Sequence, residues 1–246
     1  MASILYEHPL NERIRCYLRL EHLFNQLNAC SDYPIKASHQ VYFNALFAIV
    51  DMLERNDVRG DLIKDLEKLE QNLVLWSQSP DVDVDVLEPT LRQTISLSCH
   101  LKSNQQKWWQ LKQDKFLAGL KQRFAIQGGS ACFDLPQLHF WLNQERAQQD
   151  TKDWLTPLEH ISQSLLLILK FIRQKSSFEQ IEAPSGFYQE NGEGLSLLRI
   201  KVDDAEQYYP SVSGNRLRYS IRFMSPCAES GKRYISEPTR FQLARC

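Results

Sequence analysis

Three arginines alternate with other residues in the stretch RLRYSIRF, residues 216 to 223. Successive side chains of a β-strand point to opposite faces, so the stretch predicts a strand with Arg216, Arg218 and Arg222 on one face. Arg218 and Arg222 would be about 13 Å apart along the strand at about 3.3 Å per residue. A guanidinium group stays charged at biological pH and can bind a carboxylate through two hydrogen bonds. This spacing favours an extended acidic peptide over one small carboxylate.

The end of the chain is basic although the chain as a whole is not. From residue 205 onwards there are seven Lys or Arg and three Glu, a net charge of +4, whereas all 246 residues together carry −1. A near-neutral chain is not an evident polyanion binder, so an electrostatic function must come from local clustering. One alternative stays open: the arginines form a solvated sheet face and pair with acidic neighbours on adjacent strands.

The rest of the sequence has no recognisable catalytic or metal-binding pattern. The six histidines form no HExxH motif and have no zinc spacing with cysteine, and there is no Walker or dinucleotide loop. The GGS run at residues 128–130 is no nucleophile elbow, and the DVDVD run at residues 81–85 lacks EF-hand spacing. We therefore predict no catalytic residue, no cofactor and no metal.

The composition is that of a folded soluble protein, with 43% hydrophobic and 24% charged residues. Six widely spaced cysteines without a CxxC pair, and an N-terminus unlike a secretory signal, favour reduced thiols in the cytosol. The longest apolar run, LLLILKFI from Leu165, is interrupted by Lys170 and is shorter than the about 20 residues that span a bilayer. No membrane insertion is expected.

Helical spacing of apolar residues dominates up to about residue 123. We predict helices after Pro9, over 40–56, from an N-cap at Asp61, after a turn within 79–90, and over 108–123. The third of these has a leucine stripe that requires a facing helix, in the same chain or in a partner. The stripe consists of Leu62, Leu66, Leu69, Leu73 and Trp76.

Strand signals dominate later in the chain. Gly128 and Gly129 between apolar segments predict a hairpin. Alternating residues predict strands over 197–202, 215–224 and 239–245, while a helix over about 152–176 interrupts this region.

Helices early and strands late, without βαβ repetition, indicate an α+β fold. We expect an N-terminal helical bundle domain and a mostly antiparallel β-strand domain, both discontinuous in sequence. The helical domain is assigned residues 1–115 and 152–177, and the β-strand domain residues 116–151 and 178–246.

Several long segments resemble the ZapD family of Z-ring-associated bacterial cell-division proteins. They are YEHPLNERIRCYLRLEHL from residue 6, GGSACFDLPQLHFWL from 128, GFYQENGEG from 186 and SGNRLRYSIRFM from 213. The resemblance runs nearly end to end, and it implies a non-enzymatic homodimer whose helical domain dimerises. The implied partner is FtsZ, the tubulin-like GTPase of the division ring, bound by its C-terminal tail. The implied location is the cytoplasm, concentrated at the division site at mid-cell.

The resemblance also implies the binding residues. The family takes up the tail in a positively charged pocket between its two domains, and the matching residues here are Arg55, Arg218 and Arg222. Arg59 and Arg216 are auxiliary, because the family's strand does not always have an arginine at position 216. A dimer would have two such pockets, so one particle could hold two filaments and bundle them. Arg55 has a simpler interpretation as well, because the helix dipole favours a cation near a helix C-terminus.

Two other classes of function stay open. A single-stranded nucleic-acid-binding module would combine the arginine-lined face with aromatic rings. Tyr219, however, has the opposite parity to Arg218, and the near-neutral chain lacks a basic surplus, so no nucleic-acid partner is expected. The third class is an enzyme with an unrecognised site that holds a small anion between the domains.

Overall fold

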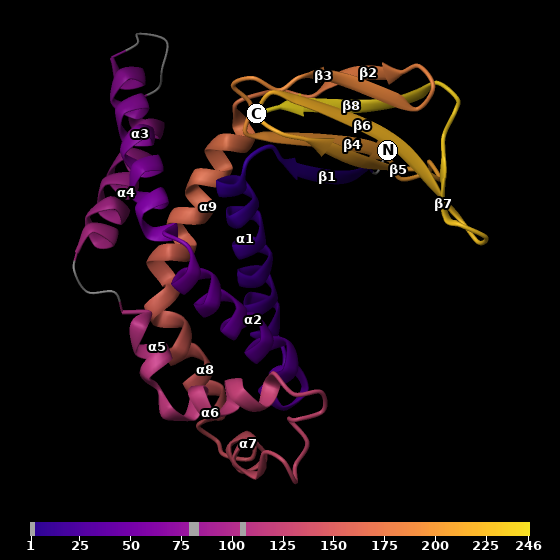
Figure 1. Cartoon of the computed structure of the whole chain (residues 1–246). Helices are drawn as coiled ribbons and strands as arrows, with labels where there is room; N and C mark the ends of the chain where they lie inside the picture. Colours follow the sequence, from indigo (N-terminus) through magenta and orange to yellow (C-terminus); the bar gives the residue numbers. More distant parts are fainter. Residues whose placement is uncertain (1–2, 79–83, 104–106) are drawn as a thin grey trace. The chain divides into compact units, whose positions relative to one another are not determined.

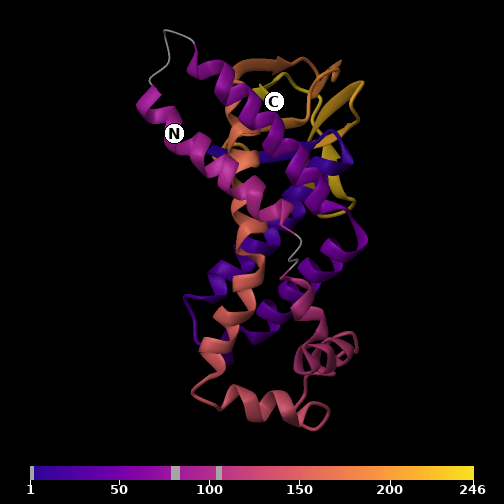
Figure 2. The same cartoon turned by 90° about the vertical axis from the view of Figure 1, so that its left-hand side faces the viewer.

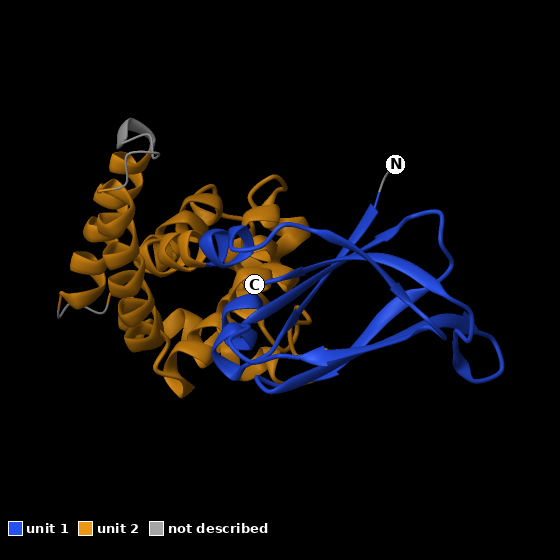
Figure 3. Ribbon diagram, turned by 90° about the horizontal axis from the view of Figure 1, so that it is seen from above, with its two compact units in different colours: residues 1–18, 169–246 blue, residues 19–168 orange. Residues whose placement is uncertain are grey.

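A computed structural model describes residues 3–78, 84–103 and 107–246 of the chain. The chain divides into two compact units (Figure 3). Unit 1 joins two separate segments, residues 1–18 and 169–246, and unit 2 is the continuous segment 19–168. Helices come early and antiparallel strands late, so the fold is α+β as predicted (Figure 1). Unit 1, which contains the strands, is discontinuous in sequence, whereas unit 2 is not.

The helices occupy most of the chain up to residue 174. They are α1 (Glu12–Cys30), α2 (Ile35–Arg55), α3 (Val58–Ser77), α4 (Val84–Lys102), α5 (Trp109–Gln113), α6 (Lys115–Phe124), α7 (Pro136–Leu142), α8 (Ala147–Leu155) and α9 (Glu159–Gln174), with a short 3-10 turn at Thr156–Leu158. Among the described residues, no helix has the length and the apolar character that a membrane crossing requires.

The leucine stripe of α3 faces α4. Leu62, Leu66, Leu69 and Leu73 are all buried, and the two helices lie side by side and antiparallel (Figures 1 and 2). The facing helix that the stripe requires is therefore in the same chain. The ambiguous run before α4 resolves in favour of a helix that begins at Val84 and contains Pro89, while residues 79–83 lie outside the described residues.

The start of α3 differs from the prediction. Its N-cap is Asp57, whose Oδ1 accepts a hydrogen bond of 3.1 Å from the backbone N–H of Gly60. Asp61 lies one turn later, inside the helix. The reason is that the chain leaves α2 in an extended conformation at Asn56, so the next helix begins directly afterwards. A cap residue must have non-helical backbone angles, and Asp61 does not have them.

The predicted fifth helix is two helices. Asp114 has an extended backbone between α5 and α6, and its carboxylate accepts hydrogen bonds from the N–H groups of Phe116 (2.8 Å) and Leu117 (3.0 Å). An aspartate that caps a new helix in this way ends the previous one. The predicted helix over 152–176 is divided as well, because Pro157 lies in the 3-10 turn between α8 and α9.

The expected hairpin at Gly128 and Gly129 is wrong. Residues 116–151 form α6, α7, most of α8 and the turns between them, without a strand. Gly128 has a φ of 71°, and the N–H of Gly129 bonds to the carbonyl of Ile126 at 3.0 Å. The glycines therefore lie in the turns that follow α6, whose C-cap is Ala125, instead of joining two paired strands. These residues, which we assigned to the β-strand domain, are helical; the division into a helical and a strand-rich domain itself stays a prediction.

Unit 1 contains two antiparallel sheets. Their strands are β1 (Ser3–Pro9), β2 (Glu179–Ala183), β3 (Phe187–Asn191), β4 (Leu197–Asp203), β5 (Tyr209–Gly214), β6 (Arg218–Cys227), β7 (Gly231–Tyr234) and β8 (Thr239–Arg245). One sheet has the order β1-β4-β8-β2, and the other has the order β3-β6-β5, with β7 also paired to β6. The sequence prediction missed β1, which pairs with β4 from Ser3 opposite Asp203 to Pro9 opposite Leu197.

The two sheets enclose one hydrophobic core. The first sheet contributes Ile200 and Leu243 among others, and the second contributes Tyr219, Ile221 and Phe223, all fully buried. Alternate residues of β6 therefore point inward, which leaves its arginines on the outer face, as predicted. The alternation begins later than expected: Leu217, predicted for the core side, lies before the strand and is 62% exposed.

Candidate functional site

The outer face of β6 holds Arg218 and Arg222, both exposed, with Ser220 between them. In the antiparallel register Arg218 lies opposite Asn191 of β3, and Arg222 lies opposite Phe187 of β3 and Ser211 of β5. Directly opposite residues in a sheet share a face. The two arginines are thus flanked by amide, hydroxyl and aromatic side chains.

No carboxylate in the described part of the chain forms an ion pair with Arg218 or Arg222. The acidic residue of β3, Glu190, has the opposite parity and lies opposite the buried Tyr219. The structure therefore does not support the alternative in which acidic residues on adjacent strands pair with these arginines. Two guanidinium groups on a sheet face, neither with a carboxylate partner, can bind an external anion.

Glu190 is held on the other side of the sheet by three donors. Its Oε2 accepts hydrogen bonds from the hydroxyls of Tyr219 (2.5 Å) and Tyr188 (2.9 Å) and from Nε of Arg245 (2.6 Å). Burial alone would raise the pKa of Glu190, but these hydrogen bonds hold the pKa below its usual value. The ionised carboxylate is thus favoured and is held away from the arginine face.

Arg222 also lies close to two aromatic rings. Its guanidinium carbon is 4.9 Å from the ring centroid of Phe187 and 5.0 Å from that of Tyr234. Sequence reasoning left out both rings. The alternation of FYQEN, residues 187–191, could have placed Phe187 on the outer face of its strand, but nothing local links Tyr234 to Arg222.

Arg216 does not lie on the strand. It belongs to a turn in which Oδ1 of Asn215 accepts hydrogen bonds from the N–H groups of Leu217 (2.9 Å) and Arg218 (3.2 Å). This side-chain-to-backbone pattern forms the turn just before β6. Arg216 is exposed beside the arginine face, not part of its alternation.

Arg55 and Arg59 belong to unit 2, at the junction of α2 and α3. Arg55 is the last residue of α2 and is exposed, with no ion pair to another described residue. Arg59 donates hydrogen bonds to the carbonyls of Leu101 (2.6 Å), Lys102 (3.3 Å) and Ser103 (3.3 Å) at the C-terminus of α4. Arg59 therefore closes a helix end, since terminal carbonyls have no partner within the helix.

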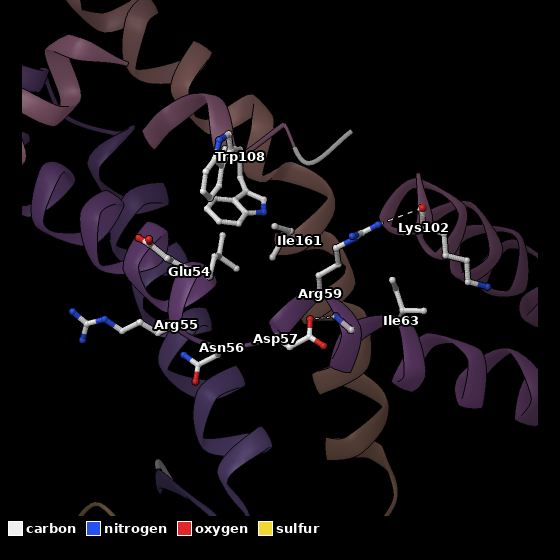
Figure 4. A pocket seen from close by; sticks show the side chains of 12 residues that line it. Glu54, Arg55, Asn56, Asp57, Arg59, Ile63, Lys102, Trp108 and Ile161 are labelled. Carbon is white, nitrogen blue, oxygen red and sulfur yellow. Dashed lines mark hydrogen bonds between the residues drawn. The ribbon is translucent and has the colours of Figure 1, made fainter. Parts of the chain in front are cut away.

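A pocket of about 680 Å³ lies at this junction. Its apolar wall includes Ile63, Trp108 and Ile161 (Figure 4). In Figure 4, Arg59 reaches toward the end of α4, and Arg55 extends in the opposite direction, away from Trp108. The pocket thus combines apolar walls with a cation at its rim.

Most other charges around this pocket are already paired. Glu54 pairs with Lys112, and Lys102 pairs with Glu67 at 2.9 Å. The described residues contain no cluster of three or more His, Cys, Asp or Glu side chains that could hold a metal ion. Residues 81–83 of the DVDVD run lie outside the described residues. Arg55, which is exposed and forms no ion pair with a described residue, is a cation at this junction that an external anion could reach.

The structure thus brings the candidate residues together in two groups. Arg218 and Arg222 share the outer face of β6, with Arg216 in the turn before it. Arg55 and Arg59 line the pocket at the α2–α3 junction.

Comparison with known proteins gives consistent matches over almost the whole chain. A family model described as "ZapD: Cell division protein" matches residues 18–222. "Cell division protein ZapD" of Idiomarina loihiensis is 42% identical, covering 99% of this chain and 96% of that protein. The proteins of the same name from Yersinia enterocolitica and Serratia proteamaculans are 39% and 36% identical, covering 100% and 99% of this chain and 98% of each of those proteins. The chain belongs to the ZapD family of cell division proteins.

Proposed function

We propose that this chain binds the C-terminal tail of FtsZ through Arg55, Arg218 and Arg222, with Arg59 and Arg216 auxiliary. As a homodimer it cross-links and bundles FtsZ filaments and so promotes Z-ring assembly. The function is non-enzymatic and is exerted in the cytoplasm at the division site. Membership of a cell-division family supports this role.

The observation that carries the proposal is the unneutralised arginine face of β6. Two exposed guanidinium groups four residues apart suit carboxylates spaced along an extended peptide. Such a contact is weak alone and sensitive to salt, because exposed charges are screened within about 8 Å at physiological ionic strength. Weak binding is sufficient when filaments display many tails, since a dimer's second engagement becomes effectively intramolecular.

Co-sedimentation with FtsZ polymers tests the proposal. Arg218→Glu and Arg222→Glu should each abolish pelleting with the polymers while the fold survives, because both side chains are exposed. The matched control is Arg240→Glu, which makes the same charge change on β8 of the same unit, where Arg240 already pairs with Glu182 at 3.4 Å. If both site variants bundle filaments at the wild-type concentration, the site assignment is wrong.

One observation favours a second candidate, single-stranded nucleic-acid binding. Tyr219 is buried and cannot stack on a base, but Phe187 and Tyr234, beside Arg222, are 37% and 53% exposed. Exposed rings next to arginines are typical of single-strand binders. A gel shift with single-stranded DNA and RNA at low salt decides this: no shift eliminates the second candidate.

A further inference from the structure

We infer that Phe187 and Tyr234 are positioning residues of the peptide site, which hold the guanidinium group of Arg222 ready for a carboxylate of an extended acidic peptide. The inference rests on the proposed function, and it adds two residues to which neither the family resemblance nor the comparisons give a role. It also distinguishes Arg222, which is held, from Arg218, which is not.

The sheet brings the three side chains together. Phe187 of β3 lies directly opposite Arg222 of β6, and Tyr234 of β7 lies opposite Met224, two residues further along β6. Residues 222 and 224 share a face because side chains alternate along a strand. Arg222 therefore has a ring from its direct neighbour and a ring from its diagonal neighbour, on two different partner strands.

The separations are those of cation–π contacts with both rings. The guanidinium carbon of Arg222 lies over the rings of Phe187 and Tyr234 at 4.9 Å and 5.0 Å, within the about 6 Å at which such attraction operates. Phe187 and Tyr234 are 37% and 53% exposed and do not belong to the core between the sheets. Their position is therefore not explained by core packing alone.

Holding the guanidinium group against these rings should increase its affinity for a carboxylate. An exposed arginine has many rotamers, and binding must fix one of them at a cost in entropy. Rings cover the faces of a guanidinium group and leave its N–H donors at the edge, where a carboxylate binds. No described carboxylate occupies those donors.

Arg218 provides an internal contrast. Like Arg222, it is exposed on the outer face of β6. Its direct neighbour, however, is Asn191, and no ring of a described residue lies over its guanidinium group. We therefore expect removal of the rings to affect the contribution of Arg222 and to leave that of Arg218 unchanged.

The first experiment measures affinity of the full chain for a synthetic peptide with the FtsZ C-terminal sequence, by calorimetry at low salt. Phe187→Leu and Tyr234→Leu should each weaken binding about two- to fivefold, the loss expected for one exposed cation–π contact. Phe187→Tyr and Tyr234→Phe keep a ring and should restore nearly wild-type affinity. Tyr209→Leu is the control. Tyr209 of β5 lies opposite Met224 of β6, yet its ring does not lie over the guanidinium group of Arg222.

A double-mutant cycle separates positioning from direct contact. In an Arg222→Gln background the Phe187→Leu and Tyr234→Leu changes should have almost no further effect, whereas in an Arg218→Gln background they should keep their full effect. If they weaken binding equally in the Arg222→Gln background, the rings contact the peptide on their own and the inference is overturned.

A third measurement needs no peptide. Ring currents should displace the NMR signal of the Arg222 Nε–H group in the free protein, and the displacement should vanish in the Phe187→Leu, Tyr234→Leu double variant. An undisplaced wild-type signal overturns the inference whether or not the peptide binds.

The failure of the proposed function is a separate outcome: the wild-type chain does not bind the peptide at all. Ring-dependent binding of a single-stranded oligonucleotide without peptide binding would contradict both.

Discussion

Glu190 accepts a hydrogen bond of 2.5 Å from the hydroxyl of Tyr219, the residue directly opposite it on the neighbouring strand. This bond lies on the inner side of the β3–β6 pair, behind the face that holds Arg218 and Arg222. The only carboxylate of β3 is thereby kept from the arginines. The face that holds Arg218 and Arg222 therefore has no carboxylate from β3 beside it.

The Glu190 network predicts a pH dependence of stability. Because the pKa of Glu190 is lowered on folding, its ionised form stabilises the fold above its unfolded pKa, and this contribution is lost as the pH falls through the folded pKa. Glu190→Gln should cost about 1–2 kcal/mol at pH 7 and reduce the loss of stability on acidification. Urea unfolding at pH 7 and below pH about 4 measures both effects. Equal pH dependence in variant and wild type would contradict the prediction.

A second carboxylate, Glu7 of β1, is held by two arginines of unit 1. Arg173 donates from Nε (2.9 Å) and from a terminal nitrogen (2.6 Å), and Arg199 donates from Nε (2.9 Å). Glu7→Gln should destabilise the protein by about 2–4 kcal/mol, because two largely covered guanidinium groups lose their counter-charge. Glu12→Gln, which removes an exposed partner of Arg15, should change stability by less than about 1 kcal/mol. Chemical unfolding should rank the two variants in this order, and the reverse order would refute the account of Glu7.

Arg59 has a structural task that an auxiliary binding role does not explain. Arg59→Ala should leave the last carbonyls of α4 without this donor, cost about 1 kcal/mol, and increase amide exchange at the C-terminus of α4. Arg59→Lys keeps the charge but not the fork of donors, so it should restore this protection only in part. Unchanged exchange in Arg59→Ala would show that these bonds do not hold the helix end.

For Arg55 we expect the opposite: an effect on tail binding and little effect on stability. It is exposed at the end of α2 without an ion pair to a described residue, so Arg55→Ala should change stability by no more than the about 1 kcal/mol of a helix-dipole contact. If it binds a carboxylate of the tail, the same change should lower affinity at least about tenfold, as expected for a hydrogen bond to a charged group. A variant with normal tail affinity would remove Arg55 from the site.

The sequence predicted those features that depend on local pattern. The parity of β6 follows from a period of two, and the end of α2 at Arg55 follows from helical spacing that stops at Asn56. The buried stripe of α3 was likewise visible as leucines at helical spacing. These signals need no knowledge of distant residues.

The features that it missed depend on long-range contacts. The first strand, β1, pairs with residues almost two hundred positions later, and its own burial pattern does not alternate, so no local signal marked it as a strand. The ring of Tyr234 reaches Arg222 only because β7 pairs with β6. The hairpin expected at Gly128 was wrong because a glycine with positive φ also occurs in turns between helices, here between α6 and α7.

The central claim is that the chain gathers FtsZ filaments by their tails, and sedimentation of FtsZ polymers with and without the C-terminal tail tests it most directly. With intact FtsZ, this chain should pellet with the polymers and bundle them, and the effect should decline as salt is raised. With FtsZ that lacks the tail, the chain should stay in the supernatant and the filaments should stay single. Equal bundling of tailless filaments would contradict the account.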